Sequence, residues 1–134
     1  MLDQAERVAE MCRREAAIFV IDDRADIAMM LDAGLHVGQD DLPPSDVRRL
    51  IGAAALLGFS THNKAQLLAA RAEPVDYLAI GPLFGTKSKE QPDPVVGVEE
   101  LRRLRPLVDR PLVAIGGITR ENALTVLDAG ADSV

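Results

Sequence analysis

With 134 residues, of which 48% are hydrophobic, the chain has enough apolar material for one core and not for two. Its 15 basic residues are interspersed among 21 acidic ones, and the net charge of −6 disfavours nucleic acid and anionic membranes as partners. The chain has a single cysteine, Cys12, so it cannot form an internal disulfide. Its first fifteen residues include several charged ones and its sequence has no long apolar run, which together predict a cytoplasmic protein. We therefore expect a single domain over residues 1–134.

Helical and extended segments alternate along the chain. Apolar residues spaced three and four apart predict helices over residues 2–15, 25–31, 45–50, 64–72, 98–107 and 120–128. Short apolar runs predict strands over residues 18–21, 35–37, 54–59, 77–80 and 112–115, with a last strand beginning at 132–134. Ser45 is the expected N-cap of its helix, and Ala33-Gly34 is the expected C-cap of the helix before it.

The fold class follows from the kind of strand. Continuous apolar runs, unlike alternating ones, indicate parallel strands covered by helices in an α/β fold. An open doubly wound sheet and a closed (β/α)8 barrel both fit, but at least five successive strands end in polar or glycine-rich sequence and no G-x-G-x-x-G turn is present, which favours the barrel. Because a barrel takes about 200–250 residues, we expect a partial TIM barrel.

Two pairs of carboxylates, Asp22-Asp23 and Asp40-Asp41, follow two successive predicted strands. One pair alone would be explained as well by capping the next helix. Two pairs at one rim favour Mg²⁺, which takes one or two carboxylates and completes its shell with water and phosphate oxygens. Arg24 is expected to pair with one of these four carboxylates.

The strand that begins at Tyr77 leads into a loop of hydroxyl and ammonium groups. The loop contains Thr86, Lys87, Ser88 and Lys89. Hydroxyl donors beside cations suit a phosphate ester. Gly116-Gly117 forms either a second phosphate-binding site at the start of a helix or a tight turn, and the two roles are compatible.

Polar residues on two other strands have separate interpretations. Ser60 and His62 lack both a nucleophile elbow and a third triad member, so Ser60 is expected to donate a hydrogen bond to phosphate instead of attacking a substrate. His36 lies inside an apolar run and is expected to be a hydrogen-bonded core histidine.

Six stretches resemble, in order and spacing, the thiamine-phosphate synthase family. They are FVIDDRAD (19–26), HVGQDDLP (36–43), STH (60–62), DYLAIGPLFGTKSK (76–89), VAIGGI (113–118) and GADSV (130–134). The resemblance implies a (β/α)8 barrel, of which this chain supplies strands 3 to 8 and lacks the first two βα units. It also implies a transferase that joins 4-amino-2-methyl-5-(diphosphooxymethyl)pyrimidine to a thiazole phosphate, giving thiamine phosphate and pyrophosphate.

The resemblance also assigns roles to residues. Asp23 and Asp41 would hold Mg²⁺, and Lys89 and Ser60 would contact the pyrimidine diphosphate and act in catalysis. The remaining substrate-binding positions would be Asp22, Thr86, Lys87, Ser88 and Gly117. Asp22 stands where the family commonly has Asn.

Two alternatives remain open: an isomerase similar to thiazole tautomerase, and a non-catalytic phosphate-binding or assembly module. The carboxylates at Asp40-Asp41 argue against the isomerase, which has no diphosphate-bound metal to hold. Because a partial barrel leaves open sheet edges, we expect either that further residues complete the barrel or that copies of the chain pair through those edges. In both cases we expect the 134 residues alone to be inactive.

Overall fold

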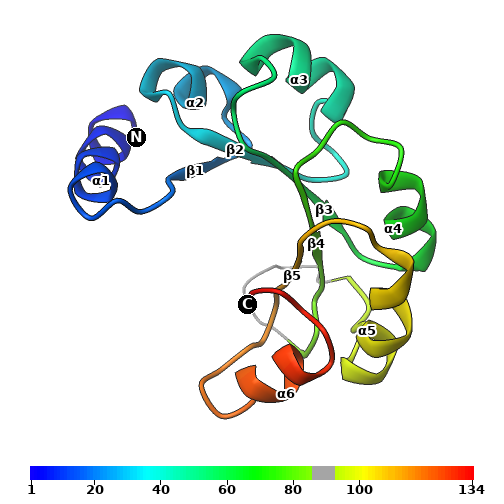
Figure 1. Cartoon of the computed structure of the whole chain (residues 1–134). Helices are drawn as coiled ribbons and strands as arrows, with labels where there is room; N and C mark the ends of the chain where they lie inside the picture. Colours follow the sequence, from blue (N-terminus) through cyan, green and yellow to red (C-terminus); the bar gives the residue numbers. More distant parts are fainter. Residues whose placement is uncertain (86–92) are drawn as a thin grey trace.

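The computed structural model describes residues 1–85 and 93–134, in which helices and parallel strands alternate (Figure 1). The helices are α1 (Leu2–Arg14), α2 (Ala25–Leu31), α3 (Pro44–Ile51), α4 (Lys64–Ala70), α5 (Val98–Leu104) and α6 (Ala123–Asp128), with a 3-10 turn, η1 (Arg105–Leu107), after α5. The strands are β1 (Val20–Asp22), β2 (Gly34–Val37), β3 (Leu57–Thr61), β4 (Tyr77–Ile80) and β5 (Leu112–Ala114). No described helix is long and apolar enough to span a membrane.

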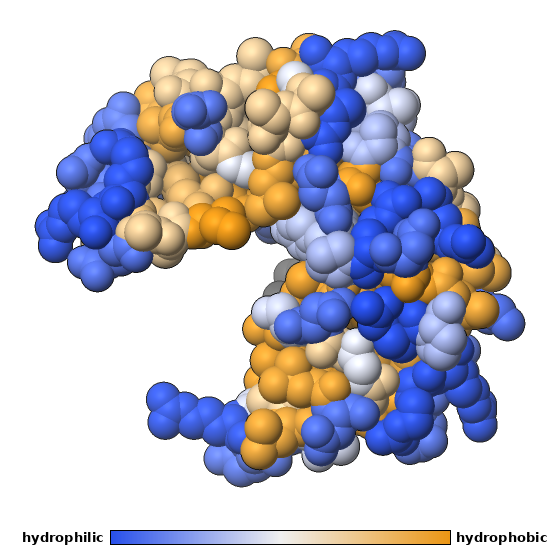
Figure 2. Space-filling model, in the orientation of Figure 1, coloured by the Kyte–Doolittle hydropathy of each residue, from blue (hydrophilic) through white to orange (hydrophobic). Residues whose placement is uncertain are grey.

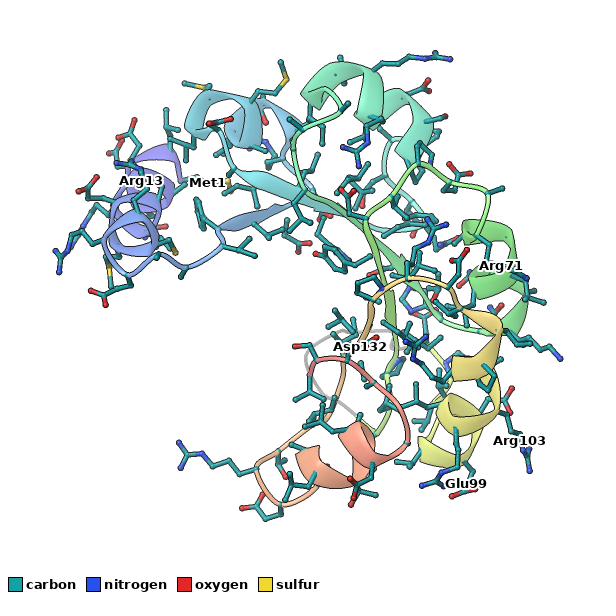
Figure 3. The ribbon with its side chains drawn as sticks, viewed as in Figure 1. Met1, Arg13, Arg71, Glu99, Arg103 and Asp132 are labelled. Atoms are coloured by element: carbon teal, nitrogen blue, oxygen red, sulfur yellow. The ribbon has the colours of Figure 1, made fainter. Side chains whose placement is uncertain are left out.

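The strands form one parallel sheet in the order β1-β2-β3-β4-β5, so every neighbour in the chain is a neighbour in space. The sheet curves, and the helices lie along its outer, convex side (Figure 1). Three of the labelled side chains are exposed at the outside of this arc: Arg71, Glu99 and Arg103 (Figure 3). The α/β class and the parallel sheet predicted from the sequence are confirmed.

Alternate strand residues face opposite sides of the sheet, as the two-residue period of a strand requires. Leu35, Leu57, Leu78 and Leu112 are 0% exposed and pack against buried residues of the outer helices. The facing helix residues include Val47, Leu67, Leu101 and Val126. The residues between these leucines face the inner side, and some of them are polar. The strands are therefore not uniformly apolar.

Strand β3 is shifted along the sequence relative to its prediction. It begins at Leu57, not at residue 54, and it continues through Ser60 to Thr61. Arg48 explains the late start, because its guanidinium donates to the carbonyls of Gly52 (3.0 Å) and Ala55 (2.6 Å) and holds the preceding residues in a loop. Ser60 thus lies within a strand.

The predicted sixth strand is reduced to one bridge, in which Ser133 pairs in parallel with Val113. The side chain of Asp132 holds this segment against β5, because its Oδ2 accepts a hydrogen bond from the Leu112 backbone N–H at 2.8 Å. Arg105 lies 3.2 Å from the same carboxylate. Figure 3 labels Asp132 at the end of the segment that follows α6.

Three local predictions are wrong. The N-cap of α3 is Pro43, with proline at the first helical position, so Ser45 does not cap this helix. The C-cap of α2 is Asp32, which takes the left-handed conformation (φ 52°), while Gly34 already belongs to β2. Arg24 pairs with Asp26, through two hydrogen bonds of 2.8 and 2.5 Å, and not with the paired carboxylates, because Asp26 is two residues away on the first turn of α2.

Candidate active site

The carboxyl ends of the strands open into a cleft with a volume of about 690 Å³. This is the edge at which parallel α/β folds place their ligands. The polar side chains that line the cleft are Asp22, Asp23, His36, Gln39, Asp40, Asp41, Ser60, His62, Gln66, Tyr77 and Asp93. Acidic, hydroxyl and imidazole groups from four neighbouring strands are therefore brought together at one site.

Both carboxylate pairs lie in this cleft, as expected from their positions after two successive strands. Asp22 ends β1 and is in register with His36 of β2. Asp23 adopts a positive φ of 61°, and its backbone N–H donates to the carbonyl of His36 at 2.9 Å, which closes β1 onto its neighbour. Oδ2 of Asp41 accepts from the backbone N–H of Gly38 at 2.7 Å, which orients this carboxylate within the loop after β2.

The donors for a cation are carboxylate oxygens. Within residues 1–85 and 93–134, no group of three or more His, Cys, Asp or Glu side chains is placed to hold a metal ion. A cation at this site would need oxygen ligands from water or from a bound ligand in addition to carboxylates of the cleft.

A chain of three hydrogen-bonded side chains crosses the inner face of the sheet. The Tyr77 hydroxyl on β4 lies 2.9 Å from Nδ1 of His36 on β2, and Nε2 of His36 lies 2.8 Å from Oγ of Ser60 on β3. The Gln39 side chain donates to the Ser60 carbonyl at 2.6 Å and so fixes the backbone of the serine as well. The prediction that His36 is hydrogen-bonded is confirmed, but it is half-buried at the cleft and not in the core.

Gly58 makes this arrangement possible. In the sheet register His36 pairs with Gly58, and Gly58 pairs with Tyr77, so the tyrosine must reach across β3 to contact the histidine. A Cβ atom at position 58 would lie 2.0 Å from Cζ of Tyr77 and 2.5 Å from Nδ1 of His36. Only glycine leaves room for the pair.

Burial and the nearby carboxylates shift the pKa values of His36 and Tyr77. Burial lowers the pKa of His36, although Asp22 and Asp41 oppose the shift. Burial, followed by the negative charge of Asp22, raises the pKa of Tyr77. Both side chains are therefore neutral at pH 7, and the imidazole offers one donor and one acceptor.

His62 lies at the other end of the cleft. Its Nδ1 donates to the carbonyl of Gly81 at 2.8 Å and lies 3.5 Å from Oδ2 of Asp93, while its backbone N–H donates to Oε1 of Gln66 at 2.7 Å. Sequence reasoning considered His62 only as a triad base and missed Gln39, Gln66 and Asp93. Gln39 lies within the stretch HVGQDDLP, but nothing in that stretch assigns it a role. Gln66 lies on α4 and Asp93 on the segment before α5, and no sequence motif marks either of them.

The predicted site residues divide into three groups. Asp22, Asp23, Asp41 and Ser60 lie together in the cleft. Gly117 follows β5 outside the cleft lining, with φ 68°, and a Cβ there would lie within 2.9 Å of the carbonyl oxygens of Phe84 and Gly85, so it packs against the chain that leads to residue 86. The loop residues Thr86, Lys87, Ser88 and Lys89 lie outside the described residues.

Comparison with known proteins gives the family. The sequence model described as thiamine monophosphate synthase matches residues 1–134, which is the whole chain. The chain belongs to the thiamine monophosphate synthase family. This confirms the resemblance recognised from the motifs.

Individual relatives of this synthase family agree. The chain is 58% identical over 116 residues to a thiamine-phosphate synthase of Koribacter versatilis, a match that covers 86% of this chain and 55% of that protein. It is 43% identical over 135 residues to a thiamine-phosphate synthase of Chloroflexus aurantiacus, covering 100% of this chain and 62% of the relative. The chain therefore spans somewhat more than half the length of these curated relatives.

The fold matches a solved member of the family. The thiamine phosphate pyrophosphorylase from Pyrococcus furiosus superposes with a TM-score of 0.88 at 33% identity, and the match covers 98% of this chain and 63% of that one. The two curated relatives are named thiamine-phosphate synthase, and the solved one is named thiamine phosphate pyrophosphorylase.

Proposed function

We propose that the cleft at the carboxyl ends of β1–β4 binds a diphosphate together with Mg²⁺. The protein of which these residues form the site would couple 4-amino-2-methyl-5-(diphosphooxymethyl)pyrimidine to a thiazole phosphate, yielding thiamine phosphate and pyrophosphate. The observation that carries the proposal is that two carboxylate pairs and the Ser60 hydroxyl meet in one cleft, in a chain of the thiamine monophosphate synthase family.

The donor set fits Mg²⁺. This ion prefers oxygen ligands, commonly takes only one or two carboxylates and relies on water and substrate phosphates for the rest of its shell. Asp23 and Asp41 are the carboxylates assigned to it here, one from each pair, and both line the cleft. When bound, Mg²⁺ would supply positive charge to the oxygens of the diphosphate.

The side chains of this protein have complementary roles in the proposed reaction. Pyrophosphate leaves the methylene carbon of the pyrimidine, and the thiazole nitrogen attacks that carbon with its lone pair, so no general base is required. Ser60 donates a hydrogen bond to the diphosphate, and Lys89 adds a cation where negative charge develops. The proposed contacts to the thiazole phosphate come from Thr86, Ser88 and the backbone of Gly117, with Asp22 and Lys87 completing the substrate site.

We also propose that the five parallel strands form part of a TIM (β/α)8 barrel and correspond to family strands from the third onward. The support is the correspondence with the longer Pyrococcus furiosus structure and the curvature of the sheet. Figure 2 shows apolar surface on the inner side of the arc, where further barrel units would pack. Ile18, which precedes β1, is 78% exposed, and Ile115, which follows β5, is 39% exposed.

Two expectations from the sequence remain proposals: a cytoplasmic location, and pairing of copies through the open sheet edges. Light scattering on purified residues 1–134, run beside a coupling assay, tests the second. We expect an assembly larger than a monomer and no thiamine phosphate. A well-folded, active monomer would contradict both the pairing and the partial barrel.

The function itself is best tested in a chimera in which this chain replaces the matching part of the Koribacter versatilis synthase. We expect the chimera to form thiamine phosphate and pyrophosphate in a Mg²⁺-dependent manner, and Asp41→Ala to abolish that activity. The matched control is Asp46→Ala, which removes an exposed carboxylate on α3 that pairs only with Arg49 among the described residues. An active Asp41→Ala chimera at limiting Mg²⁺ would contradict the metal assignment.

Lys89 has a separate test in the same chimera. Lys89→Ala should lower the turnover number by roughly 10² or more, the usual effect of removing one group that stabilises developing charge. A change confined to the Michaelis constant for the thiazole phosphate would instead assign Lys89 to the second substrate.

A further inference from the structure

We propose that Tyr77 and His36 form a positioning chain that directs the proton of the Ser60 hydroxyl into the cleft, toward an anionic oxygen of the ligand. The proposal rests on the proposed function for the identity of that ligand, a diphosphate. Neither Tyr77 nor His36 has to touch the substrate in this role, because both act through Ser60.

The geometry leaves two possible directions for the hydrogen bonds. The Tyr77 hydroxyl and Nδ1 of His36 are 2.9 Å apart, and Nε2 of His36 and the Ser60 Oγ are 2.8 Å apart. A neutral imidazole donates from one nitrogen and accepts at the other, so the direction of one bond fixes that of the other. Either all donors point from Tyr77 toward Ser60, or all point from Ser60 toward Tyr77.

The acidities of the two hydroxyl groups favour the first direction. A phenol is a much stronger acid than an aliphatic alcohol, so Tyr77 is the better donor and Ser60 the better acceptor for the same imidazole. Nδ1 of His36 then accepts from Tyr77, and Nε2–H donates to Oγ of Ser60. With its oxygen accepting from His36, the serine has its own proton available for an acceptor in the cleft.

The surroundings make Ser60 a fixed donor. Its carbonyl is held by the Gln39 side chain at 2.6 Å, and Ser60 lies in a strand that is paired on both sides. The cleft that it faces also contains Asp23 and Asp41. The Ser60 hydroxyl can donate to an anionic oxygen, and the two carboxylates can bind a divalent cation. The cleft therefore suits a ligand that carries anionic oxygens and binds together with such a cation. In the opposite direction, Ser60 would offer only lone pairs, which repel an anion.

The composition of the chain makes the direction measurable. His36 and His62 are the only two histidines, so ¹⁵N-histidine labelling of the full chain gives ring-nitrogen signals from two imidazoles, which His62→Gln assigns to their residues. The ¹⁵N shifts distinguish a protonated from an unprotonated ring nitrogen. We expect His36 to be protonated at Nε2 and unprotonated at Nδ1, and to lose this preference in Tyr77→Phe. A His36 protonated at Nδ1 alone would overturn the proposal, whatever the function of the protein.

Binding of pyrophosphate in the presence of Mg²⁺ then tests the link to the ligand in the same chain. Ser60→Ala should weaken binding about tenfold or more, as expected for the loss of a hydrogen bond to a charged group. Tyr77→Phe should weaken it several-fold, and it should add nothing in the Ser60→Ala background. Thr125→Val, which removes an exposed hydroxyl on α6, is the matched control and should bind as wild type does.

The outcomes separate the inference from the proposed function. A further loss from Tyr77→Phe in the Ser60→Ala background would overturn the positioning role, because the tyrosine would then act independently of the serine. Equal binding by wild type and Ser60→Ala would overturn the diphosphate function proposed for this cleft, and with it the ligand-directed half of the inference. The tautomer of His36 would still decide the direction of the chain.

Discussion

Gly58→Ala inserts a methyl group into the space that His36 and Tyr77 share. The added Cβ would lie 2.0 Å from Cζ of Tyr77, 2.4 Å from its hydroxyl oxygen and 2.5 Å from Nδ1 of His36. Gly58 is buried in β3 and is paired with β2 and β4, so the backbone has little freedom to withdraw. The two rings must therefore separate.

The expected cost has two parts. Forcing an extra methyl group into a packed site costs about 1–3 kcal/mol, and losing the hydrogen bond between Tyr77 and His36 costs about 0.5–1.5 kcal/mol. We therefore expect the free energy of unfolding to fall by about 1.5–4.5 kcal/mol. For a chain of this length, that lowers the melting temperature by roughly 5–16 °C.

Urea denaturation followed by far-UV circular dichroism measures this cost. Tyr77 is the only tyrosine and the chain has no tryptophan, so intrinsic fluorescence reports directly on the affected ring. Gly85→Ala is the matched control, because a Cβ there meets no atom of the described residues within 4 Å. In a Tyr77→Ala background the cost of Gly58→Ala should fall by at least half. A Gly58→Ala protein within about 0.5 kcal/mol of wild type would refute the reasoning.

Three further predictions concern charge. The folded-state pKa of Tyr77 is raised above its usual value of about 10. The contribution of Tyr77 to stability is therefore present below about pH 10 and is lost as the pH rises through the raised pKa. An absorbance titration that shows ionisation of Tyr77 at or below about pH 10 would contradict this prediction. The folded-state pKa of His36 is lowered below its usual value of about 6.5. The contribution of neutral His36 to stability is therefore present above about pH 6.5 and is lost as the pH falls through the lowered pKa. The midpoint of urea denaturation should fall with pH in this range in the wild-type protein, and this dependence should be absent in His36→Gln. Arg48, whose side chain is 16% exposed, donates to Asp76 at 2.8 Å and to three carbonyls, so Arg48→Met should cost about 2–4 kcal/mol in urea denaturation. Arg49→Met, at a position whose side chain is 80% exposed, should change the free energy of unfolding by less than about 0.5 kcal/mol. Equal changes for the two substitutions would show that the hydrogen bonds of Arg48 do not stabilise the fold.

The sequence predicts the order of elements well because hydrophobic period and strand ends are local signals. Helix α2 and strand β4 have the predicted bounds. The start of β3 was missed because the apolar residues 54–56 resemble a strand, whereas Arg48 holds them in a loop through contacts that connect distant parts of the chain.

The carboxylate half of the site was predictable from strand order alone. Parallel strands bring their carboxyl ends to one edge, so Asp22-Asp23 and Asp40-Asp41 had to meet. The contact between His36 and Tyr77 was not predictable, because it depends on the register that places Gly58 between them. A lone histidine in an apolar run gives no sign of which face of the sheet it occupies.

The assignment of the cleft to a metal diphosphate is tested most directly by crystals grown with Mn²⁺ and pyrophosphate. Mn²⁺ accepts the oxygen ligands that Mg²⁺ uses and can be located by its anomalous scattering. We expect one strong anomalous peak in the cleft, in contact with carboxylate oxygens of Asp23 and Asp41, with pyrophosphate density between the metal and the Ser60 hydroxyl. Ordered Mn²⁺ and pyrophosphate bound elsewhere, with the cleft occupied by water alone, would contradict the account.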